Sequence, residues 1–292
     1  MTSPNWAGVR APALFLCLLL TLAGCNTLSI LQSRDGRAEA LARAHDWRVT
    51  AYRTSRFKIV AYQSTQFGRT VKSRPTSTTL NVYLEGDGAA YNAGRQTSDP
   101  TPSSPNTLNL AILDPNPDTI YLARPCQYLS PKELSGCAPA YWGAYRYAEE
   151  IVKSLSQAID QAKRQSGLKK IRIFGYSGGG ALAVLIASRR QDVSAIITIS
   201  ANLDHKTWTQ RENLTPLYGS LNAADYADQT AHIPQVHFYG EEDDIVPPYV
   251  TQAYMSGIQD RSKIRVIGVR DADHDCCWIE AWTGLLGKYV YQ

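Results

Sequence analysis

The strongest constraint on the fold is a strand-like run that turns into a helix-like run within a few residues. Residues Lys170–Phe174 alternate basic and apolar side chains, the sequence GYSGG follows at 175–179, and an Ala- and Leu-rich run continues to Arg189. Further β-branched runs recur downstream, at 195–200, 235–240 and 263–269. Strands that alternate with helices form a parallel sheet with helices on both faces. We therefore expect an α/β fold built on a mostly parallel central sheet.

The first half of the chain adds strands to this sheet. The alternating sequence at 46–64 predicts an antiparallel hairpin, and buried strands are expected at 79–86 and 118–125. Apolar residues at helical spacing predict a helix over 142–165. Residues 91–116 are rich in Pro, Ser, Asn and Thr, which predicts a long surface excursion.

Residues 202–233 are mostly polar and interrupt the alternation, so we expect a small insertion that lies over one edge of the sheet. No repeat or linker divides the chain, and 46–292 is expected to be one domain. Hydrophobic residues make up 44% of the 292 residues, which is enough for a buried core. The formal net charge is +4 without any basic run, so nucleic acid is not expected as a partner.

The first 25 residues have a different character. Arg10 precedes the apolar stretch APALFLCLLLTLAGC, which is too short for a membrane-spanning helix and fits a secretory signal. Its end, Leu22–Cys25, resembles the bacterial lipobox; the alternative is an ordinary signal peptide with a chance cysteine. The resemblance implies removal of residues 1–24, lipidation of Cys25 with palmitate-type chains, and a lipidated tether over 25–45. Within it, residues 29–45 are expected to form either a polar tether or a short helix. Asn26, where an Asp would mark retention at the inner membrane, favours the outer membrane, with the domain facing the periplasm.

Four cysteines remain beyond the signal and the lipidation site: Cys126, Cys137, Cys276 and Cys277. An exported protein meets an oxidising compartment, which favours disulfides. A Cys126–Cys137 bridge closes a short loop and is the expected pair, whereas Cys276 and Cys277 either bridge each other or stay as thiols. The sequence has no C-x-x-C pair, so a zinc site is not expected, and we expect no other cofactor.

Ser177 is a candidate nucleophile because it is the serine of a G-x-S-x-G pattern, Gly175–Gly179. The pattern is weak by itself, but a predicted strand precedes it and a predicted helix follows, which is the context that this chemistry requires. The tight turn exposes the hydroxyl above the sheet, and the N–H of Gly178 points at developing negative charge. A phosphate-binding turn is the alternative, but the sequence has neither G-x-G-x-x-G nor a P-loop lysine.

A serine hydroxyl needs a base at neutral pH, and sequence position selects one of the five histidines. His274 follows the last predicted strand, so it lies at the carboxyl edge of the sheet that Ser177 also occupies. Open α/β sheets bind ligands at that edge. The other four precede the core, fall in the insertion, or lie beside or within a strand: His45, His205, His232 and His237.

The base in turn needs a carboxylate, and GEEDDIVP at 240–247 supplies four of them after a predicted strand. With these residues the chain resembles the α/β-hydrolase family from about Val49 to its end. The family order is serine, acid, histidine, with the acid in G-x-x-D-x-x-V-P, and this implies Asp243 as the acid. Asp244 is the alternative within the same run. Asp204 is the alternative if the acid follows the previous strand.

The resemblance also implies an oxyanion-binding N–H at the end of the third strand. The family has a His-Gly pair there, whereas this chain has Glu85-Gly86-Asp87. The backbone N–H groups of Asp87 and Gly178 are the expected donors, provided that the Asp87 carboxylate points away from the oxyanion. Arg146 is expected to form a surface ion pair rather than to contact substrate.

The implied function is a membrane-anchored serine hydrolase, with a small-molecule carboxylic ester or other acyl compound as substrate. Ser177 would attack the carbonyl, His274 would take its proton, Asp243 would orient the imidazole, and an acyl-enzyme would form. A peptidase or an acyltransferase would use the same residues. A lipoprotein that keeps the fold only for binding is the alternative from another class, and the complete set of three residues argues against it.

Overall fold

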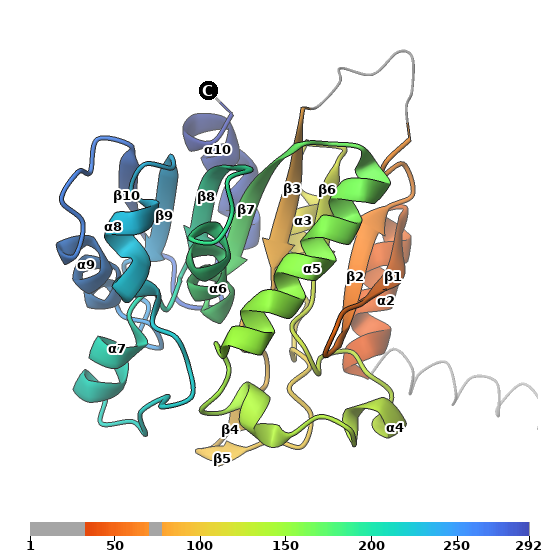
Figure 1. The fold of residues 1–292 in the computed structure, drawn as a ribbon, viewed down its shortest axis with the longest axis horizontal. Helices are drawn as coiled ribbons and strands as arrows, with labels where there is room; N and C mark the ends of the chain where they lie inside the picture. The colour runs from red at the N-terminus through yellow and green to blue at the C-terminus, as the bar shows by residue number, and fades with distance from the viewer. Residues whose placement is uncertain (1–32, 70–77, 292) are drawn as a thin grey trace, which may run out of the picture.

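The computed structural model describes residues 33–69 and 78–291, and residues 1–24 and Cys25 lie outside them. An eight-stranded sheet forms the centre of the molecule in the order β1-β2-β6-β3-β7-β8-β9-β10 (Figure 1). Its strands are β1 Trp47–Arg53, β2 Lys58–Ser64, β3 Thr79–Leu84, β6 Thr119–Leu122, β7 Lys170–Tyr176, β8 Val193–Ile199, β9 Gln235–Gly240 and β10 Ile264–Val269.

The sheet changes from antiparallel to parallel along its width. β1 pairs with β2, and β2 with β6, in antiparallel register. Every pairing from β6 through β3, β7, β8 and β9 to β10 is parallel. The predicted mostly parallel sheet and its antiparallel opening hairpin are confirmed. Since the parallel strands all end at one edge, the connections that follow β3, β6, β7, β8 and β9 begin side by side.

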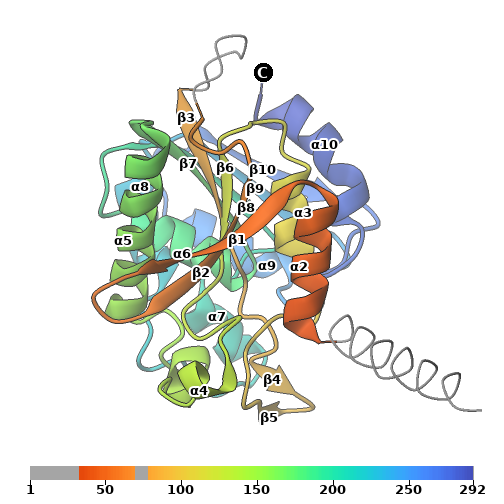
Figure 2. The ribbon, with the colours of Figure 1, turned by 90° about the vertical axis from the view of Figure 1, so that its right-hand side faces the viewer.

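Helices cover both faces of the sheet (Figure 2). On one face lie α5 Glu149–Ser166, α6 Gly178–Ala187, α8 Ala227–Thr230 and α9 Pro248–Ser256; on the other lie α2 Arg34–Ala44, α3 Asn106–Ile112 and α10 Trp278–Tyr289. Side chains along a strand alternate between the two cores. In β7, Ile171 and Ile173 join the core under α5 and α6, whereas Phe174 joins the core under α10.

α5 begins later than the helical pattern predicts. Residues Pro139–Trp142 form a separate 3-10 turn, and α5 starts at Glu149 after an extended Ala148. Two acidic residues occupy its first turn and two basic residues its last, which suits the helix dipole. Gly167 ends it in the left-handed conformation, at φ 74°.

The predicted surface excursion over 91–116 is wrong in its second half. Its first part carries the small hairpin of β4 (Tyr91–Asn92) and β5 (Arg95–Gln96), which is exposed. Its second part is α3, in which Leu108, Leu110 and Ala111 are completely buried against the sheet. The polar residues that surround this short apolar run concealed it, although its apolar side chains drive it into the core.

Of the two arrangements left open for residues 29–45, a polar tether or a short helix, the structure has the helix. From Arg34 onward the chain forms α2, whose Ala38 and Ala42 lie one turn apart and are buried against the domain. Small side chains at that spacing let the helix approach the sheet closely. The packed domain therefore begins at least ten residues before the predicted boundary at residue 46.

Cys126 and Cys137 form a disulfide with a Cα–Cα distance of 6.0 Å, as the short loop predicted. Of the two arrangements left open for Cys276 and Cys277, the structure has the bridge between these neighbours. The remaining connections include α4 Pro131–Leu134, α7 His205–Arg211 and the 3-10 turn Ala223–Tyr226. Over 33–69 and 78–291, no helix has both the length and the apolar character needed to cross a bilayer.

Candidate active site

Ser177 lies on the turn between β7 and α6, where it caps the helix. Its backbone has φ 51° and ψ −124°, a conformation that a non-glycine residue adopts only when the surrounding structure holds it there. Neighbouring glycines make that turn possible. A Cβ on Gly175 would collide with the carbonyl of Gly179, and a Cβ on Gly179 would collide with the end of β3. The strand and the helix can therefore meet closely, which presents the serine hydroxyl at the carboxyl edge of the sheet.

His274 joins Ser177 to Asp243 through hydrogen bonds. Its Nε2 lies 3.0 Å from Ser177 Oγ, and its Nδ1 lies 2.9 Å from Asp243 Oδ2. The side chain of His274 is mostly buried and that of Asp243 completely so. A carboxylate at Nδ1 favours the tautomer with a proton there, which leaves Nε2 free to accept the serine proton.

The structure distinguishes among the three candidate acids. The other oxygen of Asp243 accepts hydrogen bonds from the N–H groups of Ile245, at 3.0 Å, and Val246, at 2.8 Å, so the carboxylate is fixed in place. Asp244 is exposed to solvent. Asp204 instead caps α7 and accepts hydrogen bonds from Thr207 and Asn222.

The loop that carries His274 is held at several points. Tyr176, inside the G-x-S-x-G pattern, donates its hydroxyl to the carbonyl oxygen of His274 at 2.6 Å. Burial, together with the nearby Asp275, raises the pKa of Tyr176, so this hydroxyl stays a donor. Asp273 accepts the N–H of Cys276, and Trp278 donates its indole N–H to the carbonyl of Asp273. The loop therefore presents the imidazole in one orientation.

The remaining histidines lie in other surroundings. His237 is buried in β9 between Thr198 and Gln235, and burial lowers its pKa to about 3, so it stays neutral. His45 ends α2, His232 is exposed, and His205 is buried at the start of α7.

The Asp87 carboxylate points inward, against the helix that Ser177 begins. A Cβ on Gly178 would overlap Asp87 Oδ1, so the carboxylate fills the space that this glycine leaves. Arg124 pairs with one of its oxygens, and Arg146 Nη1 lies 2.5 Å from the other. Burial opposes ionisation of Asp87, but the charges of Arg146 and Arg124 outweigh it and hold the pKa at about 2.

Two predictions about this region need correction. Arg146 is buried and pairs with Asp87, so the predicted surface ion pair is wrong. The side chain of Asp87 does not point away, as its expected role required, but two guanidinium groups surround it. Two cations against one anion leave the group with a net positive charge, which favours an oxyanion nearby rather than opposing it.

Glu85 is a further buried carboxylate beside the predicted oxyanion loop. It accepts hydrogen bonds from the N–H of Gly86 at 2.8 Å and from the hydroxyls of Thr107 at 2.6 Å and Tyr121 at 2.7 Å. Burial raises the pKa of Glu85 although these donors oppose the shift. It ties the loop after β3 to α3 and β6. The sequence indicated only that a glutamate replaces the family's histidine, not that it anchors this loop.

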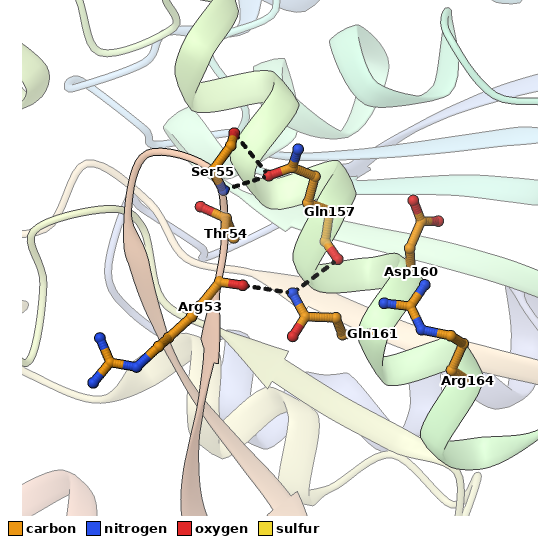
Figure 3. A pocket seen from close by; sticks show the side chains of 7 residues that line it. All are labelled: Arg53, Thr54, Ser55, Gln157, Asp160, Gln161 and Arg164. Carbon is orange, nitrogen blue, oxygen red and sulfur yellow. Dashed lines mark hydrogen bonds between the residues drawn. The ribbon is translucent and has the colours of Figure 1, made fainter.

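Several surface cavities lie outside these residues, and two of them border elements already described. One of about 380 Å³ borders the insertion and is lined by His205, Leu214 and Tyr218 among others. The other, of about 290 Å³, is polar and lies between the β1–β2 turn and α5 (Figure 3). Hydrogen bonds from Ser55 to Gln157 and from Gln161 to the carbonyl of Arg53 cross it. These bonds hold the β1–β2 hairpin against α5, so the residues that line this second cavity have a structural role.

Comparisons with known proteins identify the fold. Residues 140–274, a little under half of the chain, match the dienelactone hydrolase family, and the matched range contains Ser177, Asp243 and His274. The structure is similar to Est1E from Butyrivibrio proteoclasticus, with a TM-score of 0.55 and 14% identity over 83% of this chain and 97% of that one. The chain has the α/β-hydrolase fold.

Other α/β-hydrolase structures extend the comparison. An esterase from Pyrococcus furiosus has a TM-score of 0.57 and 11% identity, over 84% of this chain and 90% of that one. A puromycin-hydrolysing peptidase from Mycobacterium tuberculosis has a TM-score of 0.60 and 14% identity, over 83% of this chain and 38% of that one. No curated protein matches at a significant level. The matched family and the esterase structures together support a hydrolase.

Proposed function

We propose that this chain is a membrane-anchored serine hydrolase that cleaves carboxylic esters through an acyl-enzyme on Ser177. The proposal rests on the hydrogen bonds that join Ser177, His274 and Asp243. His274 Nε2 lies 3.0 Å from Ser177 Oγ, and His274 Nδ1 lies 2.9 Å from Asp243 Oδ2. The distance between Ser177 Oγ and His274 Nε2 is within reach for proton transfer. The strained turn at Ser177 is the setting in which this fold presents a nucleophilic serine.

In the first half of the reaction, Ser177 Oγ attacks the ester carbonyl carbon while its proton passes to His274 Nε2. Asp243 stabilises the resulting imidazolium through Nδ1. The carbonyl oxygen becomes an oxyanion, which the backbone N–H groups of Gly178 and Asp87 bind. When the C–O bond to the alcohol breaks, His274 returns its proton to the departing alcohol, and the acyl group stays on Ser177.

In the second half, water replaces the alcohol. His274 takes a proton from water, the hydroxide attacks the acyl carbon, and the oxyanion forms again in the same place. The bond to Ser177 Oγ breaks, the serine regains a proton from His274, and a carboxylic acid leaves.

The Asp87 group supports the oxyanion site in this scheme. Its carboxylate and the guanidinium groups of Arg124 and Arg146 fix the loop that supplies one N–H. Because the arginines exceed the carboxylate in charge, they add a positive potential to the two N–H donors.

The anchor belongs to the same proposal. Lipidation of Cys25 would hold the domain at the outer membrane, facing the periplasm, and the pattern at Leu22–Cys25 is what supports it. Two or more acyl chains give stable anchoring, whereas a single chain binds reversibly.

A fluorophosphonate probe and a series of p-nitrophenyl esters test the hydrolase. We expect the probe to label the wild-type protein and to leave Ser177→Ala unlabelled, and ester turnover by that variant to fall by roughly 10³-fold or more. Labelling or near-normal turnover in Ser177→Ala would refute the assignment. Peptide p-nitroanilides run in parallel would identify a peptidase if they outpace the esters.

A further inference from the structure

Exposed apolar side chains gather on one edge of the molecule. The described residues include seven large hydrophobic side chains that are exposed to solvent. Five of them lie in connections that leave the carboxyl ends of parallel strands. These five form the carboxyl-edge rim: Tyr91 after β3, Tyr145 after β6, Leu214 and Tyr218 after β8, and Ile245 after β9. The other two, Val49 and Val266, lie on the outermost strands β1 and β10.

The rim lies at the same edge of the sheet as the proposed active site, and two of the connections that carry it also carry site residues. Tyr91 follows Asp87 in the same connection, and Ile245 follows Asp243 by two residues. Tyr145 and Tyr218 contact each other edge to face, with ring centroids 5.6 Å apart, although they come from different connections. Tyr218 is the most exposed member, at 76%. Tyrosine, with an apolar ring and a polar tip, is enriched where proteins meet the membrane surface.

The described chain also starts at this edge. Arg34, in the first turn of α2, donates from Nη1 to the carbonyls of Asp99 and Thr101, each at 2.9 Å. Those carbonyls belong to the connection that leaves the carboxyl end of β3. In Figure 2 this end of α2 points toward the same edge of the molecule as β4 and β5.

The length of the preceding chain limits where a lipid anchor at Cys25 can lie. Ser33 follows Cys25 by eight positions, and eight steps along the chain span at most roughly 29 Å even when fully extended. A domain of this size measures about 45–50 Å across. The anchor therefore cannot reach around to the opposite edge, and the edge that carries the rim lies within the tether's reach of the bilayer.

Charge gives no reason for this edge to prefer anionic lipid. Exposed Arg95 and Arg211 share it with exposed Glu241 and Glu242. Contact through the rim would therefore rest on apolar and aromatic side chains and would suit zwitterionic headgroups.

From these observations we propose that the carboxyl-edge rim rests on the lipid surface and that the enzyme takes acyl esters of membrane lipids from it. This inference rests on the proposed function, whose substrate class it narrows. In this arrangement the bilayer surface covers the carboxyl-edge rim. Ser177 then faces the interfacial region of the bilayer, which contains the ester bonds of the lipids.

Rates on two substrates test the proposal. The variant Leu214→Ser/Tyr218→Ser is compared with Val49→Ser/Val266→Ser, which removes the two exposed large hydrophobic side chains that lie outside the rim among the described residues. One substrate is p-nitrophenyl acetate in water, and the other is a diacyl phosphatidylcholine in vesicles of phosphatidylcholine and phosphatidylethanolamine. We expect the rim variant to lose at least tenfold on vesicles while its rate on p-nitrophenyl acetate stays within twofold, and the control variant to match the wild type on both. An undiminished vesicle rate, or an equal loss on both substrates, would overturn the proposal.

Photocrosslinking separates this proposal from the hydrolase itself, because it needs no turnover and no substitution in the rim. The full chain is bound to the same vesicles with a photoactivatable phosphatidylcholine, and lipid-modified peptides are mapped by mass spectrometry. We expect adducts on peptides that contain Tyr218 and Ile245, in the wild type and in Ser177→Ala alike. Adducts confined to β1 and β10 would refute the membrane-facing rim. Adducts on the rim in a wild-type protein that hydrolyses no ester would support the membrane-facing rim and refute the proposed hydrolase function.

Discussion

At the scale of single residues, the carboxylates of the site differ most in what surrounds them. Asp243 is fixed by two N–H groups and the imidazole, whereas Asp244 beside it is exposed. Asp243→Asn should lower kcat by about 10⁴-fold, because the amide favours the wrong tautomer of His274. Asp244→Asn should stay within about twofold of the wild type. Steady-state kinetics on one p-nitrophenyl ester compares them, and a crippled Asp244→Asn with an active Asp243→Asn would contradict the geometry.

Asp87 gives a pH dependence of stability. Its pKa is held at about 2 in the folded protein, below the ordinary 3.8, so it contributes stability that is present above about pH 4 and is lost as pH falls toward 2. The contribution is of order 2 kcal/mol. Asp87→Asn should therefore be less stable than the wild type at pH 5, and the difference between the two should shrink by pH 2.5. Denaturant unfolding at both pH values measures it, and a difference that is constant with pH would contradict the ion pairs.

Single site residues could be predicted where a local sequence motif marks them, but not where their role depends on contacts with residues far away in the sequence. Ser177, Asp243 and His274 stand in a recognisable order after predicted strands, so they could be named from the sequence. The group around Asp87 could not, because Arg124 and Arg146 are 37 and 59 residues from it and neither has a motif of its own. Two arginines look alike in a sequence whether they face water or a partly buried carboxylate.

At the scale of elements, helices and strands were predicted correctly where the segment itself shows a clear hydrophobic periodicity. The strand and helix around Ser177 lie within a residue or two of the predicted bounds, because the apolar run and the glycines mark them locally. α3 was missed since its seven residues are too few to show a clear period among polar neighbours. α2 has almost no apolar residue larger than alanine, and its burial depends on the sheet it meets.

The Cys126–Cys137 disulfide should make a measurable contribution to the free energy of unfolding. It closes a loop with a separation of 11 residues, so its loss should lower the free energy of unfolding by about 2–3 kcal/mol through the freedom of the unfolded chain. Cys126→Ser/Cys137→Ser should show this in guanidinium unfolding and keep ester turnover. Cys276→Ser/Cys277→Ser is the matched control, because that bridge closes almost no loop. An equal loss of stability in both variants would argue against loop closure as the cause.

At the scale of the whole molecule, the start of the described chain and the proposed active site lie toward the same edge of the sheet, and we propose that the lipid anchor precedes this start. With Cys25→Ser the protein should no longer take up labelled palmitate, and its partition into the detergent phase should fall to that of an unlipidated protein. The reason is that acyl chains, and not the folded domain, supply most of the membrane affinity. Metabolic labelling followed by detergent phase separation measures both effects. Unchanged membrane partition in Cys25→Ser would mean that another part of the chain is the anchor.

The most direct test of the central claim is to trap the acyl-enzyme. The protein is mixed with p-nitrophenyl acetate, quenched in acid within the first turnovers, digested and analysed by mass spectrometry. We expect an acetyl group on Ser177 in the wild type, appearing with a burst of p-nitrophenol that matches the enzyme concentration, and neither signal in Ser177→Ala. Acetyl groups on other residues only, or turnover without any acylated serine, would contradict the proposed mechanism.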